Sequence, residues 1–406
     1  MKQLNLVALG ALVAAYALGP MATQILTPAV PFVHRDFAIS MAAAQTLISL
    51  AFATIAVMTL IYGPLSDRYG RRPVILAGTA LFCVGSAIAD FAPTPGVLIA
   101  GRMLQAAGSS AGLVLTRTVI HDVYGRERSA KVLAYVTVVM IFVPTLSPLA
   151  GGVLLDHASW RAIFALCGSL GAVALALLAA RLPETHPVQT SGPGLREVFG
   201  SYGALLADRR YLGPALFFSF VMATFFVTQA AIPYLIVEVR GGTATEYGAW
   251  FVVLGAFYIA GNYAAGRWGH LVPRGKLISF SGAGCLATAI GGLVVVYKLD
   301  WDTATLFVPA TVLSFIAAIA IAPVQAEAVS AQPERSGAAS GLMSGMQMAI
   351  GAAAVQFIGF THDGTPYPMF IALVACAAAA LFAYAGTTFA QRRVHPHRGF
   401  TLDRAG

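Results

Sequence analysis

Long apolar runs alternate with short polar turns along nearly the whole chain. A helix needs about 20 mostly apolar residues to cross the hydrocarbon core of a bilayer, and twelve runs reach that length. The first run is too long for a removable signal peptide and lacks its cleavage pattern, so we expect it to remain as a helix. The pattern predicts an all-α membrane protein with transmembrane helices at residues 4–27, 42–64, 73–92, 97–120, 132–154, 161–181, 211–235, 247–266, 277–297, 304–326, 337–360 and 368–390.

One long break divides these runs into two groups of six. It contains PETHPVQTSGPG, whose prolines and glycines cannot continue a helix. Further along the break, apolar residues recur at helical spacing from Leu195 to Leu206. This predicts an amphipathic helix on the inner membrane face, with a partner-binding helix as the alternative. We therefore expect an N-terminal half at 1–181, a cytoplasmic linker at 182–210, a C-terminal half at 211–390 and a cytoplasmic tail at 391–406.

Charged residues are scarce and gather in the turns. They make up 10% of the 406 residues, against roughly 25% in an ordinary soluble domain. If the N-terminus is inside, nineteen Lys and Arg residues fall in cytoplasmic segments and four fall outside. Cationic loops stay on the cytoplasmic side, so both termini should be cytoplasmic. The net charge of +8 is spread over these short turns, which argues against a nucleic-acid partner.

The sequence offers no catalytic, metal or cofactor site. The isolated HPH of His395 and His397 is a weak metal motif, and no Ser, His and acid group lies at one depth as a membrane enzyme would need. The cysteines have neither pairing nor ligand spacing, which favours small core hydrophobes. They are Cys83, Cys167, Cys285 and Cys376.

The turn between the second and third runs, GPLSDRYGRRP at 63–73, places one acid among three arginines. Topology alone explains Arg68 and Arg72 but not Asp67. Asp67 can approach the positive N-terminal end of another helix, and Arg71 can pair with Asp122 at the inner end of the fourth run. A weak echo, GRWGHLVPRGK at 266–276, joins the eighth run to the ninth, as in transporters built from two repeated halves with a midplane substrate site.

These segments together resemble the major facilitator superfamily, and within it the drug-efflux branch of the Bcr/CflA type. GPLSDRYGRRP resembles the signature turn of that family. Arg102, Gln105 and Gly108 in GRMLQAAGSSAG resemble its second motif, with Ala106 where glycine is usual. PTLSPLAGG at 144–152 resembles the antiporter motif, and WRAIF at 160–164 and PERSGAASGL at 333–342 also resemble this branch.

The resemblance implies two pseudo-symmetric six-helix halves and a secondary active transporter in the inner membrane. It would export small amphipathic drugs by alternating access as a proton antiporter, with membrane lipid as its surroundings, and we expect a monomer. The resemblance further implies that Asp67, Arg68, Arg71 and Asp122 latch the inner ends of the halves while the cavity opens outward. The eleventh helix, starting near Gly337, would receive Asp67.

Two other functions stay open. The same fold could carry or exchange a single metabolite, for example an anion, without proton coupling. A membrane sensor that binds a ligand without moving it is the third hypothesis, although no added soluble domain supports it.

One residue departs from the pattern of the family. The resemblance predicts an aspartate before TPAVP in the first helix, and Gln24 stands there. No carboxylate lies well inside any of the twelve runs. A glutamine can hydrogen-bond a substrate but cannot carry a proton. Proton coupling is therefore expected from the resemblance only.

Two arginines lie within the fourth run, where an arginine on lipid would cost a few kcal/mol. Arg117 is near enough to the inner surface to extend toward it or to join Asp122. Arg102 lies deeper, which predicts a buried polar role in the coupling or substrate region. It stays protonated, so it can organise a proton acceptor but cannot be one.

Polar and aromatic residues on several helices predict the lining of a substrate cavity, because aromatic and methionine side chains adapt to apolar ligands and amides orient them. On the fifth helix, the residues Pro144, Pro148, Gly151 and Gly152 predict a hinge or seal, with simple close packing as the alternative. The predicted cavity residues are Tyr16, Thr23, Gln24, Arg102, Gln105, Phe225, Phe226, Gln229, Tyr258, Asn262, Tyr263, Gln325, Met343, Met346 and Gln347.

Overall fold

The structure, a computed structural model, describes residues 4–185 and 195–394, and every regular element in these ranges is helical. Twelve of its helical segments are long and apolar enough to cross a membrane, as the hydropathy pattern predicts. The fold is therefore that of an all-α, multi-pass membrane protein. The predicted tail and the segment 186–194 of the linker lie outside the described residues, except for residues 391–394.

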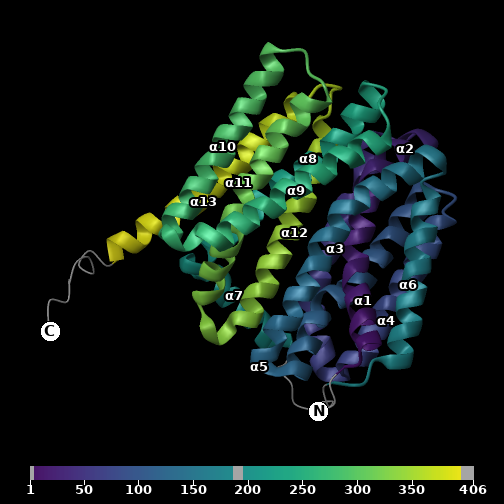
Figure 1. The fold of residues 1–406 in the computed structure, drawn as a ribbon, viewed down its shortest axis with the longest axis vertical. Coiled ribbons are helices and arrows are strands. Elements are labelled where there is room, and N and C mark those ends of the chain that lie inside the picture. The colour runs from purple at the N-terminus through teal and green to yellow at the C-terminus, as the bar shows by residue number, and fades with distance from the viewer. Residues whose placement is uncertain (1–3, 186–194, 395–406) are drawn as a thin grey trace.

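The N-terminal half contains α1 (Leu6–Leu26), η1 (Thr27–Ala29), α2 (Val30–Asp36), α3 (Met41–Tyr69), α4 (Arg71–Asp90), α5 (Pro95–His157) and α6 (Arg161–Arg181). After α7 (Leu195–Ala207), the C-terminal half contains α8 (Arg209–Tyr234), the π-helix η2 (Leu235–Val239), α9 (Ala244–Trp268), η3 (Gly269–Leu271), α10 (Arg274–Lys298), α11 (Thr303–Ser330), η4 (Pro333–Arg335), α12 (Ser336–Thr361) and α13 (Tyr367–Val394). Figure 1 shows the two halves side by side, with α1 to α6 in one group and α8 to α13 in the other.

Two boundaries differ from the predicted runs. The first span continues through η1 and α2 to Asp36, because Pro28 and Pro31 each occupy the first turn of a new helical segment, where a missing N–H is tolerated. The fourth and fifth spans form the single element α5, which changes direction at Gly125, whose φ is 66°. We refer to the end of the bundle that carries Gly63–Pro73 as the cytoplasmic end, following the predicted orientation, and to the opposite end as the outer end.

Close helix contacts within a half depend on small residues. A Cβ added to Gly85 of α4 would lie 2.3 Å from the backbone nitrogen of Gln105, and one added to Gly108 of α5 would lie 2.3 Å from that of Phe82. Glycine therefore lets α4 and α5 approach backbone to backbone, a common packing solution between membrane helices.

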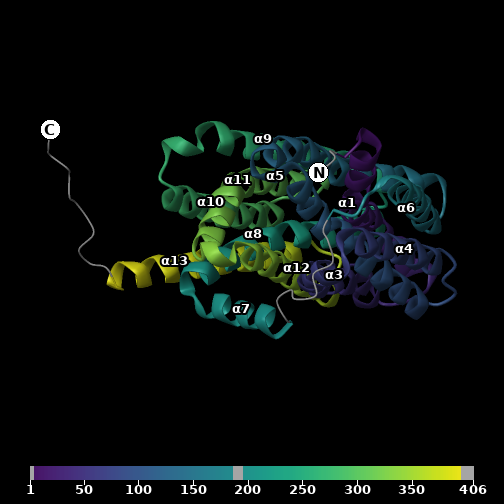
Figure 2. The same ribbon diagram turned by 90° about the horizontal axis from the view of Figure 1, so that it is seen from below.

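The short helix α7 packs against α8 and α12 at the edge of the C-terminal half, as the view from below shows (Figure 2). Leu205 is fully buried there and Leu206 is 45% exposed. This one-sided burial agrees with an amphipathic helix packed against the C-terminal half.

Candidate functional site

The two halves are joined at the outer end. Several hydrogen bonds and one ion pair cross between the halves in the outer part of the bundle. Arg35 of α2 pairs with Glu238 of η2 at 2.5 Å. The amide of Gln45 in α3 donates to the Ala230 carbonyl of α8 at 2.8 Å. Together with further contacts between α3 and α12, these bonds form what we call the outer seam.

A helix cap from the opposite half completes the outer seam. Asp156, near the end of α5, accepts hydrogen bonds from the backbone N–H groups of Ala244 at 3.2 Å and Thr245 at 3.0 Å. These are the first residues of α9. The unpaired N–H groups and positive end of a helix favour a carboxylate. The sequence alone suggests no role for Asp156, because the two segments are 88 positions apart.

The fifth transmembrane helix is tightly packed at this seam. A Cβ on Gly151 would lie 2.3 Å from the Ile25 carbonyl oxygen of α1, and one on Gly152 would lie 2.3 Å from the Ala244 carbonyl oxygen of α9. The helix stays regular through Pro144 and Pro148. The contacts show close packing of this helix, and its role as a hinge or seal stays a prediction.

Deeper in the bundle, two glutamines bridge the halves. Gln229 of α8 donates from Nε2 to Oε1 of Gln24 in α1 at 2.5 Å. The two side chains are 3% and 7% exposed, so the bond is shielded from solvent. Gln24 thus occupies the position where the resemblance predicts an aspartate. Its side chain forms a hydrogen bond with Gln229 of the opposite half.

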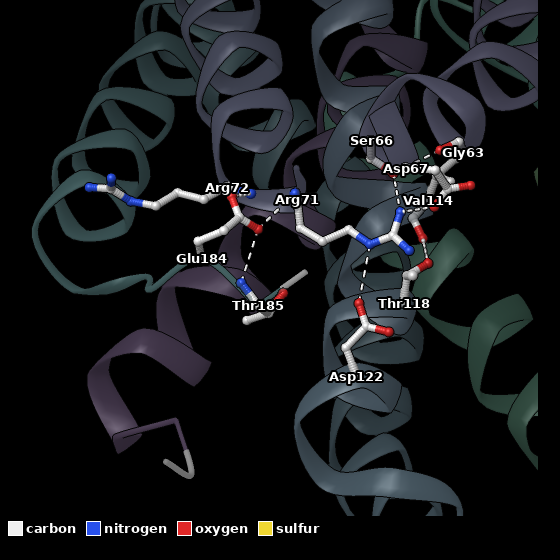
Figure 3. A network of polar contacts seen from close by, with 10 residues as sticks. All are labelled: Gly63, Ser66, Asp67, Arg71, Arg72, Val114, Thr118, Asp122, Glu184 and Thr185. Atoms are coloured by element: carbon white, nitrogen blue, oxygen red, sulfur yellow. Dashed lines mark hydrogen bonds and ion pairs between the residues drawn. The ribbon is translucent and has the colours of Figure 1, made fainter. Parts of the chain in front are cut away.

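At the cytoplasmic end, the charged turn forms a cluster within the N-terminal half (Figure 3). Arg71 is 6% exposed and lies 3.1 Å from Asp122 of α5, the partner suggested by sequence, and 2.6 Å from Asp67. Its guanidinium also donates to Ser66. Arg68 points elsewhere and stacks over the ring of Tyr69, 5.4 Å from its centroid.

The predicted contact of Asp67 with the eleventh transmembrane helix, α12, is absent from the described residues. Asp67 is paired with Arg71 and its side chain is 37% exposed. In this structure Arg71, and not the start of α12, pairs with Asp67, while the bonds of the outer seam join the halves toward the opposite end of the bundle.

Glu184 is a residue of this cluster that sequence reasoning missed. Its carboxylate accepts from the backbone N–H groups of Arg71 at 3.0 Å and Arg72 at 3.2 Å, at the start of α4. Gly70 precedes that helix with φ 93°, a value that favours glycine, and it has no side chain to cap the helix itself. The available signal was an acid directly after the sixth run, in PET.

Arg102 lies in a polar cluster inside the N-terminal half and not on an open cavity. It is 1% exposed and donates to Gln105 Oε1 at 2.6 Å and Thr23 Oγ1 at 3.1 Å. Gln105 is also 1% exposed and donates to Ser86 at 2.8 Å. The buried polar position predicted for Arg102 is confirmed; Arg102 and Gln105 are enclosed among α1, α4 and α5, and their part in a substrate cavity stays a prediction. No carboxylate of the described residues pairs with Arg102, and its Nε lacks a partner.

Arg117 is exposed, and its side chain forms a hydrogen bond with the buried Tyr16 of α1. The Arg117 guanidinium also lies 3.8 Å from the Met140 sulfur. The alternative pairing with Asp122 is not among the contacts of the described residues, since Asp122 binds Arg71.

The other predicted cavity residues separate into three groups. Tyr263 is 69% exposed and lies on an exposed face of α9 together with Ala256, Ala260 and Arg267. It therefore does not lie beside the half-buried Tyr258 of the same helix. Phe226 is buried and packs on Phe52 of the opposite half, with ring centroids 4.5 Å apart. Met343 is buried as well, whereas the half-buried residues are Phe225, Tyr258, Asn262, Gln325, Met346 and Gln347.

Two of these residues line a small pocket in the C-terminal half. Phe225 and Tyr258 meet Thr224 and Thr228 of α8 and Ser314 of α11 around a cavity of about 20 Å³. The pocket lies in the middle stretches of α8, α9 and α11, and therefore near the midplane. We call it the C-half pocket.

The sequence comparisons agree with this architecture. The model of the Major Facilitator Superfamily matches residues 12–356. The uncharacterized MFS-type transporter YdgK of Bacillus subtilis (strain 168) is 27% identical over 91% of this chain and 92% of its own. Multidrug resistance protein D of Escherichia coli (strain K12) is 29% identical over 85% and 86% of the two chains. The bicyclomycin resistance protein homolog of Haemophilus influenzae is 25% identical over 90% and 92%.

A solved structure shares the fold. It is a bacterial homolog of the human lysosomal transporter Spinster, described as inward-facing and unoccupied, and it matches with a TM-score of 0.72 at 16% identity over 95% of this chain and 96% of its own. At this identity the similarity concerns the fold. A family match over most of the chain, together with the twelve spans, shows that this protein is a transporter of the Major Facilitator Superfamily and not an enzyme.

Proposed function

We propose that this protein is a drug-efflux transporter of the Bcr/CflA type that exports small amphipathic compounds by alternating access. The relatives named for multidrug and bicyclomycin resistance support the substrate class. The observation that carries the mechanism is the set of hydrogen bonds and the ion pair that join the halves at the outer end, because a carrier that works by alternating access closes one end at a time.

The outer seam corresponds to the inward-facing state of such a cycle. The cap of α9 by Asp156 and the ion pair between Arg35 and Glu238 hold the outer end closed. In the opposite state, these contacts would break and the cytoplasmic ends would meet. Asp67 would then leave Arg71 and approach the positive start of α12, which would make the cluster of Asp67, Arg71 and Asp122 a latch for that state.

Coupling to protons belongs to this proposal through family membership. No acid lies in the middle of a transmembrane helix, so the proton would have to bind nearer a helix end. The proposal also includes an inner-membrane location with both termini cytoplasmic, as the loop charges predict, and a monomer surrounded by lipid. A carrier for one anion gains no support, because Arg102 is enclosed by Thr23 and Gln105.

Antibiotic susceptibility tests the proposal in cells. The gene is expressed in a bacterium whose own efflux pumps are deleted, and growth inhibition and intracellular accumulation of bicyclomycin are measured. We expect a higher inhibitory concentration and lower accumulation than in cells with the empty vector. Equal accumulation, at matched membrane levels of the protein, would contradict the export of this compound class.

A further inference from the structure

The C-half pocket contains a hydroxyl group that lacks a partner. Ser314 is 6% exposed, and its Oγ has no hydrogen-bond partner among the described residues. Burying a hydroxyl without a hydrogen bond costs about 1–3 kcal/mol. Most serines and threonines of the transmembrane helices donate instead to a carbonyl one turn earlier, as Thr228 does to Thr224 at 2.9 Å. The hydroxyl of Ser314, which faces the pocket, is therefore free to bind a group from outside the chain.

The chemistry of the pocket selects an uncharged group. None of the described residues that line it is charged; its walls combine apolar side chains with the hydroxyls of Thr224, Thr228, Tyr258 and Ser314. The Thr224 hydroxyl already donates to the Val221 carbonyl at 2.7 Å. Ser314 is left as a free donor, which suits a carbonyl, hydroxyl or ether oxygen. A cation would find no carboxylate here, and an anion would find no basic group.

The size and place of the pocket fit a substituent of a larger ligand. A cavity of about 20 Å³ holds one water molecule or one small polar group. Met222, Phe225 and Tyr258 line the pocket and are half-buried, so the remainder of a ligand can lie beside aromatic and methionine side chains. The α8 residues that line the pocket precede Gln229 and therefore lie nearer the cytoplasmic end. The outer seam does not cover the cytoplasmic side of the pocket.

We propose that the C-half pocket binds an uncharged oxygen-bearing group of the substrate through Ser314, and that the protein selects neutral amphipathic compounds over organic cations. This inference rests on the proposed export function and names the substrate class. The pocket is large enough for one water molecule, which the polar group of the substrate would displace.

The test is equilibrium binding to the purified full-length protein, with bicyclomycin as the uncharged probe and tetraphenylphosphonium as the cationic one. Ser314→Ala should weaken bicyclomycin binding about 3- to 10-fold, the effect of one hydrogen bond. Thr311→Val is the matched control: Thr311 lies one turn away on α11, is also 6% exposed and also lacks a partner, but does not line the pocket. It should leave affinity unchanged.

Thermal unfolding separates binding from folding. Neither hydroxyl has an internal partner to lose, so both variants should unfold at or above the temperature of the wild type. Equal bicyclomycin affinity in Ser314→Ala and wild type, or displacement of bicyclomycin by an equal concentration of tetraphenylphosphonium, would overturn this inference while leaving the export function standing. A wild-type protein that binds no bicyclomycin would contradict the proposed function itself and the inference with it.

Discussion

The carboxylate of Asp156, in the N-terminal half, caps the first turn of a helix in the other half by accepting the backbone N–H of Ala244 at 3.2 Å. The neighbouring N–H of Thr245 is bound at 3.0 Å. An acid at the positive end of a facing helix is the arrangement that sequence reasoning expected at the opposite end of the molecule, for Asp67. The outer seam thus contains the same kind of interaction, and in this structure the interaction is formed.

Asp156→Asn should shift the protein toward the outward-open state. The amide keeps one acceptor but removes the negative charge from the helix end, which is worth up to about 1 kcal/mol, or roughly a fivefold change in the equilibrium. The measurement is the reaction rate of Met41→Cys, 2% exposed at the seam, with an impermeant thiol reagent added from outside. The four native cysteines are replaced by alanine. We expect faster labelling when Asp156→Asn is added to the Met41→Cys protein. An equal labelling rate with Asp and with Asn at position 156 would exclude a latch at this position.

Arg71→Ala should slow transport about 10-fold or more while ligand affinity stays within a few fold. The substitution leaves Asp67 and Asp122 without the cation between them, so it alters conformational exchange at a site remote from the C-half pocket. Arg181→Ala, an exposed arginine at the same end, provides the control. Transport rate and binding are measured on the same preparation. Loss of binding with normal exchange would show that Arg71 belongs to the substrate site.

The hydropathy pattern predicted the helices well, because spanning a bilayer demands long apolar runs whatever the tertiary contacts are. Side-chain partners were predictable where spacing is local or motif-based, as for Arg71 and Asp122. The cap of α9 by Asp156 and that of α4 by Glu184 depend on contacts between distant segments, which no periodicity encodes. Depth in the run predicted correctly that Arg102 is buried and polar, but depth alone cannot distinguish a side chain on a cavity from one enclosed within a half, as Arg102 is in this structure.

Arg102→Lys should destabilise the protein by about 2–3 kcal/mol, because a shorter ammonium cannot reach both acceptors in the geometry of the guanidinium, and hydrogen bonds to charged groups carry about this energy. The acceptors are Gln105 and Thr23. Arg117→Lys, at an exposed position, should stay within about 0.5 kcal/mol. Thermal unfolding in detergent compares the two. Equal stability of both variants would refute the structural role of Arg102.

An acid in α1 should create proton coupling at position 24 but not at position 23. Thr23 contacts the Arg102 guanidinium, so the acid of Thr23→Asp would be held ionised, whereas the acid of Gln24→Asp would face Gln229 and could titrate. We expect Gln24→Asp to make transport depend more strongly on a pH gradient than in the wild type. Uptake into proteoliposomes at matched and opposed pH measures this. If transport by Thr23→Asp and by Gln24→Asp depended equally on the pH gradient, the contacts of position 23 with Arg102 and of position 24 with Gln229 would not govern proton binding.

Counterflow in proteoliposomes tests alternating access most directly, because it requires one binding site to face each side in turn and does not depend on the coupling ion. Vesicles containing the purified protein are loaded with excess unlabelled bicyclomycin and diluted into a trace of labelled compound. Alternating access predicts a transient accumulation of label above its equilibrium level, absent from protein-free vesicles. Retained binding of bicyclomycin without any such overshoot would show a protein that binds its ligand without moving it, and would contradict alternating access.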